Sequence, residues 1–349
     1  MRTALWFIPI LVVFWWLVND HCFINLFLHF QLYKVIAHCP PCRYISQVID
    51  GKKLAEDVLS QLKTDIEKYV AQTKLTPKLT AVLVGKNAAS ESYVKIKMKA
   101  AKKVGIATET VRCPESVSED DLLKIIHELN ANPKVNGILV QLPVPNHLPE
   151  RVVCNAVAPE KDVDGFNITN IGRLCLNLKT MVPCTALAVY HIIRHIGVQT
   201  LGKSAVVCGR SKNVGMPIAL MLHSQGGAKG GGLDATTTIC HRFTPQNELA
   251  KLTKSADIIV SAAGVPKLIR GDMIKEGAIV IDVGMTRLLD ETTNKASFVG
   301  DVDFDEVVKI AGYVTPVPGG VGPVTVAMLL KNTFRAAFIQ QNPLYINMI

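Results

Sequence analysis

The segment Gly202-Lys-Ser-Ala-Val-Val-Cys-Gly-Arg-Ser-Lys-Asn-Val-Gly-Met-Pro217 carries the strongest indication of the fold. Its apolar residues 205–208 are long enough for a buried strand, and Gly209 ends that strand. Gly215 and Pro217 then open a helical pattern. A strand, a glycine turn and a helix start aim free backbone N–H groups and the helix dipole at a phosphate. The segment therefore predicts a phosphate-binding turn.

The turn differs from the generic dinucleotide-binding motif, because five residues separate Gly209 from Gly215 and G-x-G-x-x-G has a shorter spacing. An ordinary strand-to-helix turn with solvated charges is the alternative. Arg210, Ser211 and Lys212 lie on the turn, and cationic and hydroxyl donors at this place favour the phosphate site.

Strands and helices alternate along the chain on both sides of this segment. The expected helices are 51–70, 90–104, 119–131, 186–195, 217–223 and 245–255, and the expected strands are 78–84, 107–112, 137–142, 205–208, 235–240, 258–261 and 278–283. This alternation predicts parallel sheets with helices on both faces. We expect an α/β protein of two domains, the second of them Rossmann-like, joined near Pro183. The run Gly226–Gly232 precedes a strand and is expected to be a flexible surface loop.

The first 45 residues differ from the rest of the chain. Ala4–Val18 carries no charge, and Arg2 precedes it, which is typical of a signal peptide or a signal anchor. The uncharged run is shorter than the span of about 20 residues that crosses a membrane. Residues 1–45 are therefore expected to be an apolar leader or targeting segment.

The composition of the whole chain narrows the choice of ligands. The net charge is +9 and is spread through the body, while aromatic residues make up 6%. The aromatic residues do not interleave with the basic cluster at 95–103, so nucleic-acid binding by base stacking is not favoured. The positive charge instead favours a small anionic ligand. The only close cysteine pair, Cys39-Pro-Pro-Cys42, is weak evidence for zinc or redox work. The other cysteines are expected to be buried thiols in a reducing compartment.

A second group of polar residues lies upstream. Tyr93 and Lys97 are four apart on an expected helix and share one of its faces. Gln141 lies at the carboxyl end of an expected strand, the edge where open α/β sheets bind ligands. Asp162 and Asp164 lie in a turn-forming run. A phenol, an amine, an amide and a carboxylate could converge there; a solvated lysine face and a turn-capping aspartate are the alternative.

Five motifs occur in order along the chain: Ser92-Tyr-Val-Lys-Ile-Lys97, Gly137-Ile-Leu-Val-Gln-Leu-Pro143, Pro159-Glu-Lys-Asp-Val-Asp-Gly165, Gly209-Arg-Ser-Lys-Asn-Val-Gly-Met-Pro217 and Thr315-Pro-Val-Pro-Gly-Gly-Val-Gly-Pro323. Together they closely resemble the methylenetetrahydrofolate dehydrogenase–cyclohydrolase family, over residues 49–337. The resemblance implies oxidation of 5,10-methylenetetrahydrofolate to the methenyl form with a nicotinamide dinucleotide, followed by hydrolysis to 10-formyltetrahydrofolate. It implies a folate-binding catalytic domain over 46–186, an NAD-binding domain over 187–320, and a last helix, 321–340, that returns to the first domain.

The resemblance also implies roles for single residues. Lys97 would be the acid–base and electrostatic group beside the one-carbon unit, Gln141 would hold it by a hydrogen bond, and Tyr93 would position it or stack near the substrate. Asp164 would accept hydrogen bonds from pterin N–H groups, and Pro318 and Gly319 would line the folate side. The residues implied to contact the dinucleotide are Arg210, Ser211, Gly215, Met285 and Thr325.

The segment Cys240-His-Arg242 has arginine where NADP-using members of the family carry serine. With Asp234, this resembles the mitochondrial NAD-dependent branch, which uses inorganic phosphate and magnesium. Arg210 and Arg242 would clamp the phosphate, and Asp234 would serve the magnesium. The branch carries a further aspartate where this chain has Asn177, whose amide adds no charge to the metal site.

The resemblance further implies a mitochondrial homodimer that acts on tetrahydrofolate derivatives, polyglutamylated forms among them. The leader departs from an Arg-rich transit peptide, so a membrane anchor or a non-authentic start stays open. Two other functions stay open as well, an NADP-preferring form of the enzyme and a non-catalytic dinucleotide-binding sensor.

Overall fold

In a computed structural model of the chain, residues 46–226, 231–289 and 296–341 are described. The expected leader (1–45), with the Cys39–Cys42 pair, lies outside these ranges, as does the middle of the Gly226–Gly232 run. Among the described residues, no helix is both long and apolar enough to cross a membrane.

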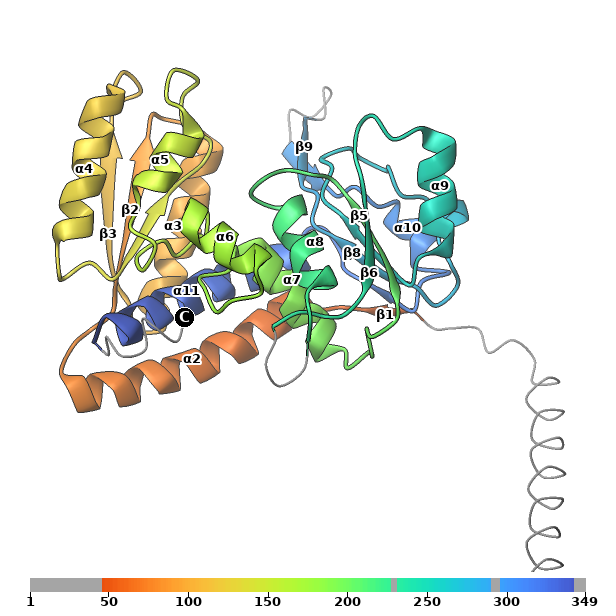
Figure 1. Ribbon diagram of the computed structural model, residues 1–349, viewed down its shortest axis with the longest axis horizontal. Coiled ribbons are helices and arrows are strands. Elements are labelled where there is room, and N and C mark those ends of the chain that lie inside the picture. The colour runs from red at the N-terminus through yellow and green to blue at the C-terminus, as the bar shows by residue number, and fades with distance from the viewer. Residues whose placement is uncertain (1–45, 227–230, 290–295, 342–349) are drawn as a thin grey trace, which may run out of the picture. The chain divides into compact units, whose positions relative to one another are not determined.

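The first sheet has three parallel strands in the order β3-β2-β4, with bounds Ala107–Cys113, Lys78–Val84 and Gly137–Val140. Side chains of β2 alternate between two apolar clusters, because successive residues of a strand point to opposite faces. Leu79, Ala81 and Leu83 pack with helices α2 (Gly51–Thr73) and α3 (Ala88–Lys103). Val82 and Val84 pack with α4 (Glu119–Ala131) and α5 (Glu150–Ala156) on the other face. The central strand β2 is therefore covered on both faces (Figure 1).

Side-chain caps fix where the helices of this domain begin. The Asp50 carboxylate accepts hydrogen bonds from the first N–H groups of α2, at 3.0 Å from Lys52 N and from Lys53 N. Asn87 caps α3 in the same way, and Ser118 caps α4. These caps satisfy N–H groups that have no partner within the helix.

The second sheet has six parallel strands in the order β1-β11-β8-β7-β5-β6. Their bounds are β1 Gln47–Val48, β11 Tyr313–Val314, β8 Ile279–Asp282, β7 Ile258–Ser261, β5 Ser204–Cys208 and β6 Thr236–Cys240. Helices α7 (Cys184–His195) and α8 (Gly215–His223) share an apolar cluster with one face of the sheet, and α9 (Gln246–Ser255) and α10 (Phe304–Val307) share a cluster with the other. The predicted α/β fold with parallel sheets is confirmed.

The first and last elements of the body cross between the two expected domains. β1, within the range 46–186 assigned to the first domain, pairs with β11 at the edge of the second sheet. Helix α11 (Val321–Gln341) packs against α2 and α3 and also against α7. Helix α11 thus contacts helices of the first domain, and the expected domain bounds stay a prediction. The place of β1 does not follow from the sequence, because two residues carry no periodicity.

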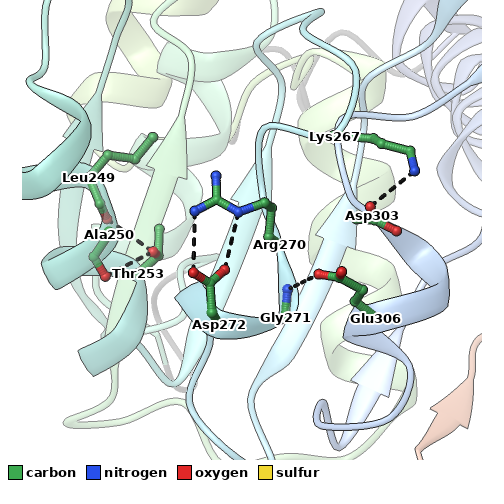
Figure 2. A network of polar contacts seen from close by, with 9 residues as sticks. All are labelled: Leu249, Ala250, Thr253, Lys267, Arg270, Gly271, Asp272, Asp303 and Glu306. Atoms are coloured by element: carbon green, nitrogen blue, oxygen red, sulfur yellow. Dashed lines mark hydrogen bonds and ion pairs between the residues drawn. The ribbon is translucent and has the colours of Figure 1, made fainter.

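Several short elements were not expected. They are α5, α6 (Ile168–Cys175), the antiparallel pair β9 (Thr286–Leu289) and β10 (Ala296–Val299), the 3-10 turn η1 (Gly271–Met273) and α10. Figure 2 shows the polar contacts around η1. Gly271 N donates to Glu306 of α10 at 3.2 Å, and Arg270 forms an ion pair with Asp272. These contacts fix the loop between β7 and β8.

The six described cysteines are all free, and all but Cys175 are buried, as expected for buried thiols. Burial raises the pKa of Cys184 well above that of an ordinary thiol. Among the described residues there is no group of three or more His, Cys, Asp or Glu side chains that could hold a metal ion.

Candidate active site

The first sheet changes direction between β2 and β4. From β2 the chain passes through α3 to β3 on one side, and then through α4 to β4 on the other. Ligands of open α/β sheets bind at the carboxyl ends of strands at such a switch point. Gln141 directly follows β4, and Lys97 of α3 reaches it: Lys97 Nζ donates to Gln141 Oε1 at 3.0 Å. The predicted pair is therefore formed at this edge.

Tyr93 lies one helical turn before Lys97. The Lys97 ammonium is 5.8 Å from the centre of the Tyr93 ring, within the range of a cation–π contact. The Tyr93 hydroxyl is 3.9 Å from Met285 Sδ, just after β8 in the second domain. Burial raises the pKa of Tyr93. Tyr93 thus links the lysine to the other domain, where Met285 was expected to contact the dinucleotide.

Asp164 joins the same group from a third segment. A parallel bridge between Ile138 and Asp162 brings this segment beside β4. Burial raises the pKa of Asp164 to about 6, opposed by the charge of Lys97 and reinforced by that of Asp162. A carboxyl group with this pKa changes charge close to neutral pH, as functional-site groups often do.

The two neighbouring charged residues have structural roles. Asp162 is buried and accepts hydrogen bonds from Gly165 N, Asn167 N and the Asn170 amide, at 3.0, 2.7 and 2.9 Å. The Lys161 ammonium donates to three carbonyl groups at the end of α4. The sequence placed Asp162 and Asp164 together, and the structure separates a turn-forming carboxylate from one that faces Lys97.

Pro318 and Gly319 form the turn that leads into α11. Gly319 has φ +110° and lies against the start of α2, where a side chain on Gly51 would collide with the carbonyl of Gly320. Only glycine adopts such a conformation at low cost. Thr325, one turn into α11, donates from Oγ1 to Val321 O at 3.1 Å. Its expected contact with the dinucleotide stays a prediction.

The second sheet changes direction between β5 and β7, where the glycine turn lies. Gly209 has φ +131°, and an added Cβ there would collide with the carbonyl of Ala262 after β7. A Cβ on Gly215 would collide with the Gly209 carbonyl. Ser211 Oγ accepts from Gly215 N, the N–H group of the first residue of α8, at 3.1 Å. The turn thus brings a helix N-terminus to the switch point, as its sequence predicted.

Arg210 and Arg242 converge on one aromatic ring. Their guanidinium carbons are 5.8 and 5.2 Å from the centre of the Phe243 ring. Neither guanidinium forms a hydrogen bond or an ion pair with any residue that the structure describes. Two unpaired guanidinium groups this close suit an oxyanion with several acceptor atoms.

The expected role of Asp234 at a magnesium site stays a prediction. Asp234 precedes β6, whereas Arg242 follows it, and a five-residue strand separates its ends by on the order of 15 Å. Asp234 N donates to Ser224 O, at the carboxyl end of α8, whose amino end is at the glycine turn. The Asp234 carboxylate accepts from Gly226 N at 2.9 Å. Asn177 lies nearby and donates to Gln225 O at 3.0 Å. Asp234 and Asn177 thus both contact the segment that follows α8.

Comparison with known proteins decides the family. The family model "Tetrahydrofolate dehydrogenase/cyclohydrolase, catalytic domain" matches residues 49–164, and "Tetrahydrofolate dehydrogenase/cyclohydrolase, NAD(P)-binding domain" matches 183–341. A mitochondrial bifunctional methylenetetrahydrofolate dehydrogenase/cyclohydrolase 2 of Callithrix jacchus is 53% identical, over 84% of this chain and 85% of that protein. The chain belongs to the tetrahydrofolate dehydrogenase/cyclohydrolase family.

Other members of the tetrahydrofolate dehydrogenase/cyclohydrolase family agree. The mitochondrial bifunctional enzyme of Gallus gallus is 54% identical, over 86% of this chain and 89% of that protein. The solved structure of a 5,10-methylenetetrahydrofolate dehydrogenase from the silkworm, Bombyx mori, has a TM-score of 0.80 and 51% identity, and the match covers 85% of this chain and 99% of that one. The match to the NAD(P)-binding model places a dinucleotide-binding fold on the second sheet.

Two buried carboxylates in this domain escaped the sequence analysis. Asp301 accepts from Ser261 Oγ and from the N–H groups of residues 263–265, the loop after β7. Asp282 accepts from Gly284, Asp301 and Val302 N–H groups. Burial raises the pKa of Asp282 to about 6. For Asp282, the sequence signal that could have found it is an aspartate at the end of the apolar strand expected at 278–283. These carboxylates shape the loops at the carboxyl edge of the sheet.

Proposed function

We propose that the protein oxidises 5,10-methylenetetrahydrofolate to 5,10-methenyltetrahydrofolate with NAD and hydrolyses the product to 10-formyltetrahydrofolate. The observation that carries this proposal is the Lys97–Gln141 hydrogen bond of 3.0 Å, beside Asp164 and at a switch point of a parallel sheet. In the first step a hydride leaves the methylene carbon for the dinucleotide. In the second, water adds to the methenyl carbon, a proton is released, and a carbon–nitrogen bond breaks.

The residues of the first domain would bind and orient the folate. Asp164, as a carboxylate, accepts hydrogen bonds from pterin N–H groups, and such charge-assisted bonds are strong. Lys97 holds a positive charge and transferable protons beside the one-carbon unit, and Gln141 fixes its direction. Tyr93 covers Lys97, and Pro318 and Gly319 line the folate side. Bound folate and nicotinamide supply the reactivity, and these residues supply position and charge.

The dinucleotide would bind along the carboxyl edge of the second sheet. The N–H groups of the Gly209–Gly215 turn face its pyrophosphate, with Ser211 holding the start of α8 and with Met285 and Thr325 near the nicotinamide end. Inorganic phosphate would bridge Arg210 and Arg242, whose guanidinium groups contact the Phe243 ring but have no hydrogen-bond or ion-pair partner among the described residues. This phosphate occupies the place that a 2′-phosphate would need, so it favours NAD.

The same two arginines also suit the 2′-phosphate of NADP, and this is the second candidate for the cofactor. A magnesium ion served by Asp234 stays a prediction for the NAD version, and β6 separates Asp234 from Arg242 along the chain. Added phosphate distinguishes the two candidates. It should activate turnover if NAD is the cofactor, and it should compete with the 2′-phosphate if NADP is the cofactor.

Three further proposals follow from the family alone. Mitochondrial relatives at 53% identity support a mitochondrial location. The homodimer and the use of polyglutamylated folates stay predictions. A non-catalytic sensor is disfavoured by the assembled group of Tyr93, Lys97, Gln141 and Asp164.

Steady-state kinetics with both dinucleotides, with and without phosphate and with magnesium as a separate variable, test this proposal. We expect NAD turnover to rise when phosphate and magnesium are added together. Turnover that responds to phosphate but not to magnesium would count against the predicted role of Asp234, and phosphate-independent preference for NADP would reverse the choice of cofactor.

A further inference from the structure

Three side chains connect the glycine turn of the second domain to the first domain. Asn213 lies in that turn, and its Nδ2 donates to Glu150 Oε1 at 2.7 Å. The Asn213 Oδ1 accepts from Arg151 Nη2 at 3.3 Å. Glu150 and Arg151 are the first two residues of α5. We call Glu150, Arg151 and Asn213 the interdomain bridge.

The bridge continues into the folate loop. Arg151 Nη1 donates to Phe166 O at 2.8 Å, and Phe166 is two residues beyond Asp164. The loop is held from within, because Asp162 accepts from the N–H groups of Gly165 and Asn167. Arg151 therefore joins the glycine turn to a folate loop whose own shape is held by Asp162.

The hydrogen bonds of the bridge require an amide at position 213 and a guanidinium at position 151. Asn213 must accept from a cation on one side and donate to a carboxylate on the other, and an amide does both. The guanidinium of Arg151 uses two nitrogens for two acceptors at once, which the single ammonium of lysine does not match. Charge-assisted hydrogen bonds of this kind are the stronger ones.

The place of the bridge gives it a function in the two-ligand reaction. Asp164 belongs to the folate site and the glycine turn to the dinucleotide site, so the bridge joins the two binding loops directly. Hydride transfer depends steeply on the distance between donor and acceptor carbons, and a misplacement of about 1 Å can cost on the order of a hundredfold in rate. Hydrolysis of the methenyl compound needs water and no dinucleotide.

We propose that the interdomain bridge positions the dinucleotide turn against the folate loop for hydride transfer, with Arg151, Glu150 and Asn213 as positioning residues. This inference rests on the proposed function. It assigns these three residues to the dehydrogenase step and not to the cyclohydrolase step.

A double-mutant cycle with Glu150→Ala, Asn213→Ala and the double variant tests the proposal in the full-length enzyme. Each single change should lower dehydrogenase kcat/KM by about tenfold or more. The double variant should lose no more than the worse single one, because both changes break one chain of hydrogen bonds. Cyclohydrolase activity should change by less than about twofold. The deuterium isotope effect on dehydrogenase kcat should rise, because misplacement slows the chemical step.

Two additional variants act as controls. Arg151→Lys keeps the positive charge but cannot donate to Phe166 O and Asn213 Oδ1 from two fixed nitrogens. It should therefore reproduce the loss of dehydrogenase activity. Asn247→Ala removes an amide of the second domain that donates to its neighbour Glu248, and it should leave both activities unchanged. Equal losses of both activities, or additive losses in the double variant, would overturn the inference while leaving the proposed function intact. Absence of any turnover in the unsubstituted enzyme would overturn both.

Discussion

Replacing Asp164 with asparagine is expected to make the protein more stable and less active. Asparagine keeps the size of the side chain and removes the charge. Burial raises the pKa of Asp164 to about 6 from 3.8, despite the opposing charge of Lys97 and with the support of Asp162. The folded state therefore holds the ionised carboxylate at a cost, which the substitution relieves.

The direction and size of the effect follow from proton linkage. A carboxyl group whose pKa is raised by folding contributes stability that is full below pH 3.8 and is lost as the pH rises through 6. A shift of about two units corresponds to about 3 kcal/mol of unfolding free energy at pH 8. The advantage of Asp164→Asn should shrink to about half of that near pH 5. The same change removes charge-assisted bonds to the pterin and should lower kcat/KM by about 10- to 100-fold.

Urea unfolding of both proteins across pH 5–8 measures the first effect, and folate-dependent kinetics measure the second. Asp162→Asn is the contrasting variant. Burial raises the pKa of Asp162 as well, but its carboxylate accepts three hydrogen bonds in the native turn, and the loss of these bonds should destabilise the fold. The reasoning is refuted if Asp164→Asn is no more stable than the unsubstituted protein at pH 8, or if its advantage does not depend on pH.

Four other changes have defined outcomes. Lys97→Met should lower cyclohydrolase turnover by about a hundredfold or more while NAD binding, followed by calorimetry, is unchanged; near-normal hydrolysis would remove Lys97 from the mechanism. Arg242→Ser should raise the phosphate concentration for half-maximal NAD turnover by about tenfold and improve the use of NADP, and unchanged phosphate titrations would count against the arginine clamp. Gly215→Ala should abolish measurable dinucleotide binding, because the added Cβ meets the Gly209 carbonyl, yet keep cyclohydrolase activity; intact NAD affinity would contradict the proposed contact. A chain that begins at Ile45 should be fully active, whereas one that begins at Asp50 lacks β1 and should unfold at lower urea concentration; equal midpoints would show that the edge strand adds nothing.

The elements with clear periodicity could be predicted from the sequence. The strand β7 and the helix α4 have the predicted bounds, because runs of apolar residues and helical spacing reflect local burial. The short strands β1 and β11 could not be predicted, since each has two residues and forms only through pairing with a distant partner.

The sequence predicted the part of the candidate site that depends on local pattern, and not the part that depends on contacts between distant segments. Tyr93 and Lys97 share a helix face, and Gln141 ends a strand, so their convergence follows from local pattern and sheet topology. Asp234 was placed by resemblance alone, and the direction of β6 separates it from Arg242. The bridge between Arg151 and Asn213 joins residues 62 positions apart, one at the start of α5 and the other in the glycine turn, and no periodicity in either segment indicates this contact.

The most direct test of the account is product analysis with the purified protein, 5,10-methylenetetrahydrofolate, NAD and phosphate. The account predicts that NADH appears by its absorbance and that 10-formyltetrahydrofolate appears by mass spectrometry, with both products greatly reduced in Lys97→Met. Reduction of neither NAD nor NADP, with folate recovered unchanged, would contradict the central claim.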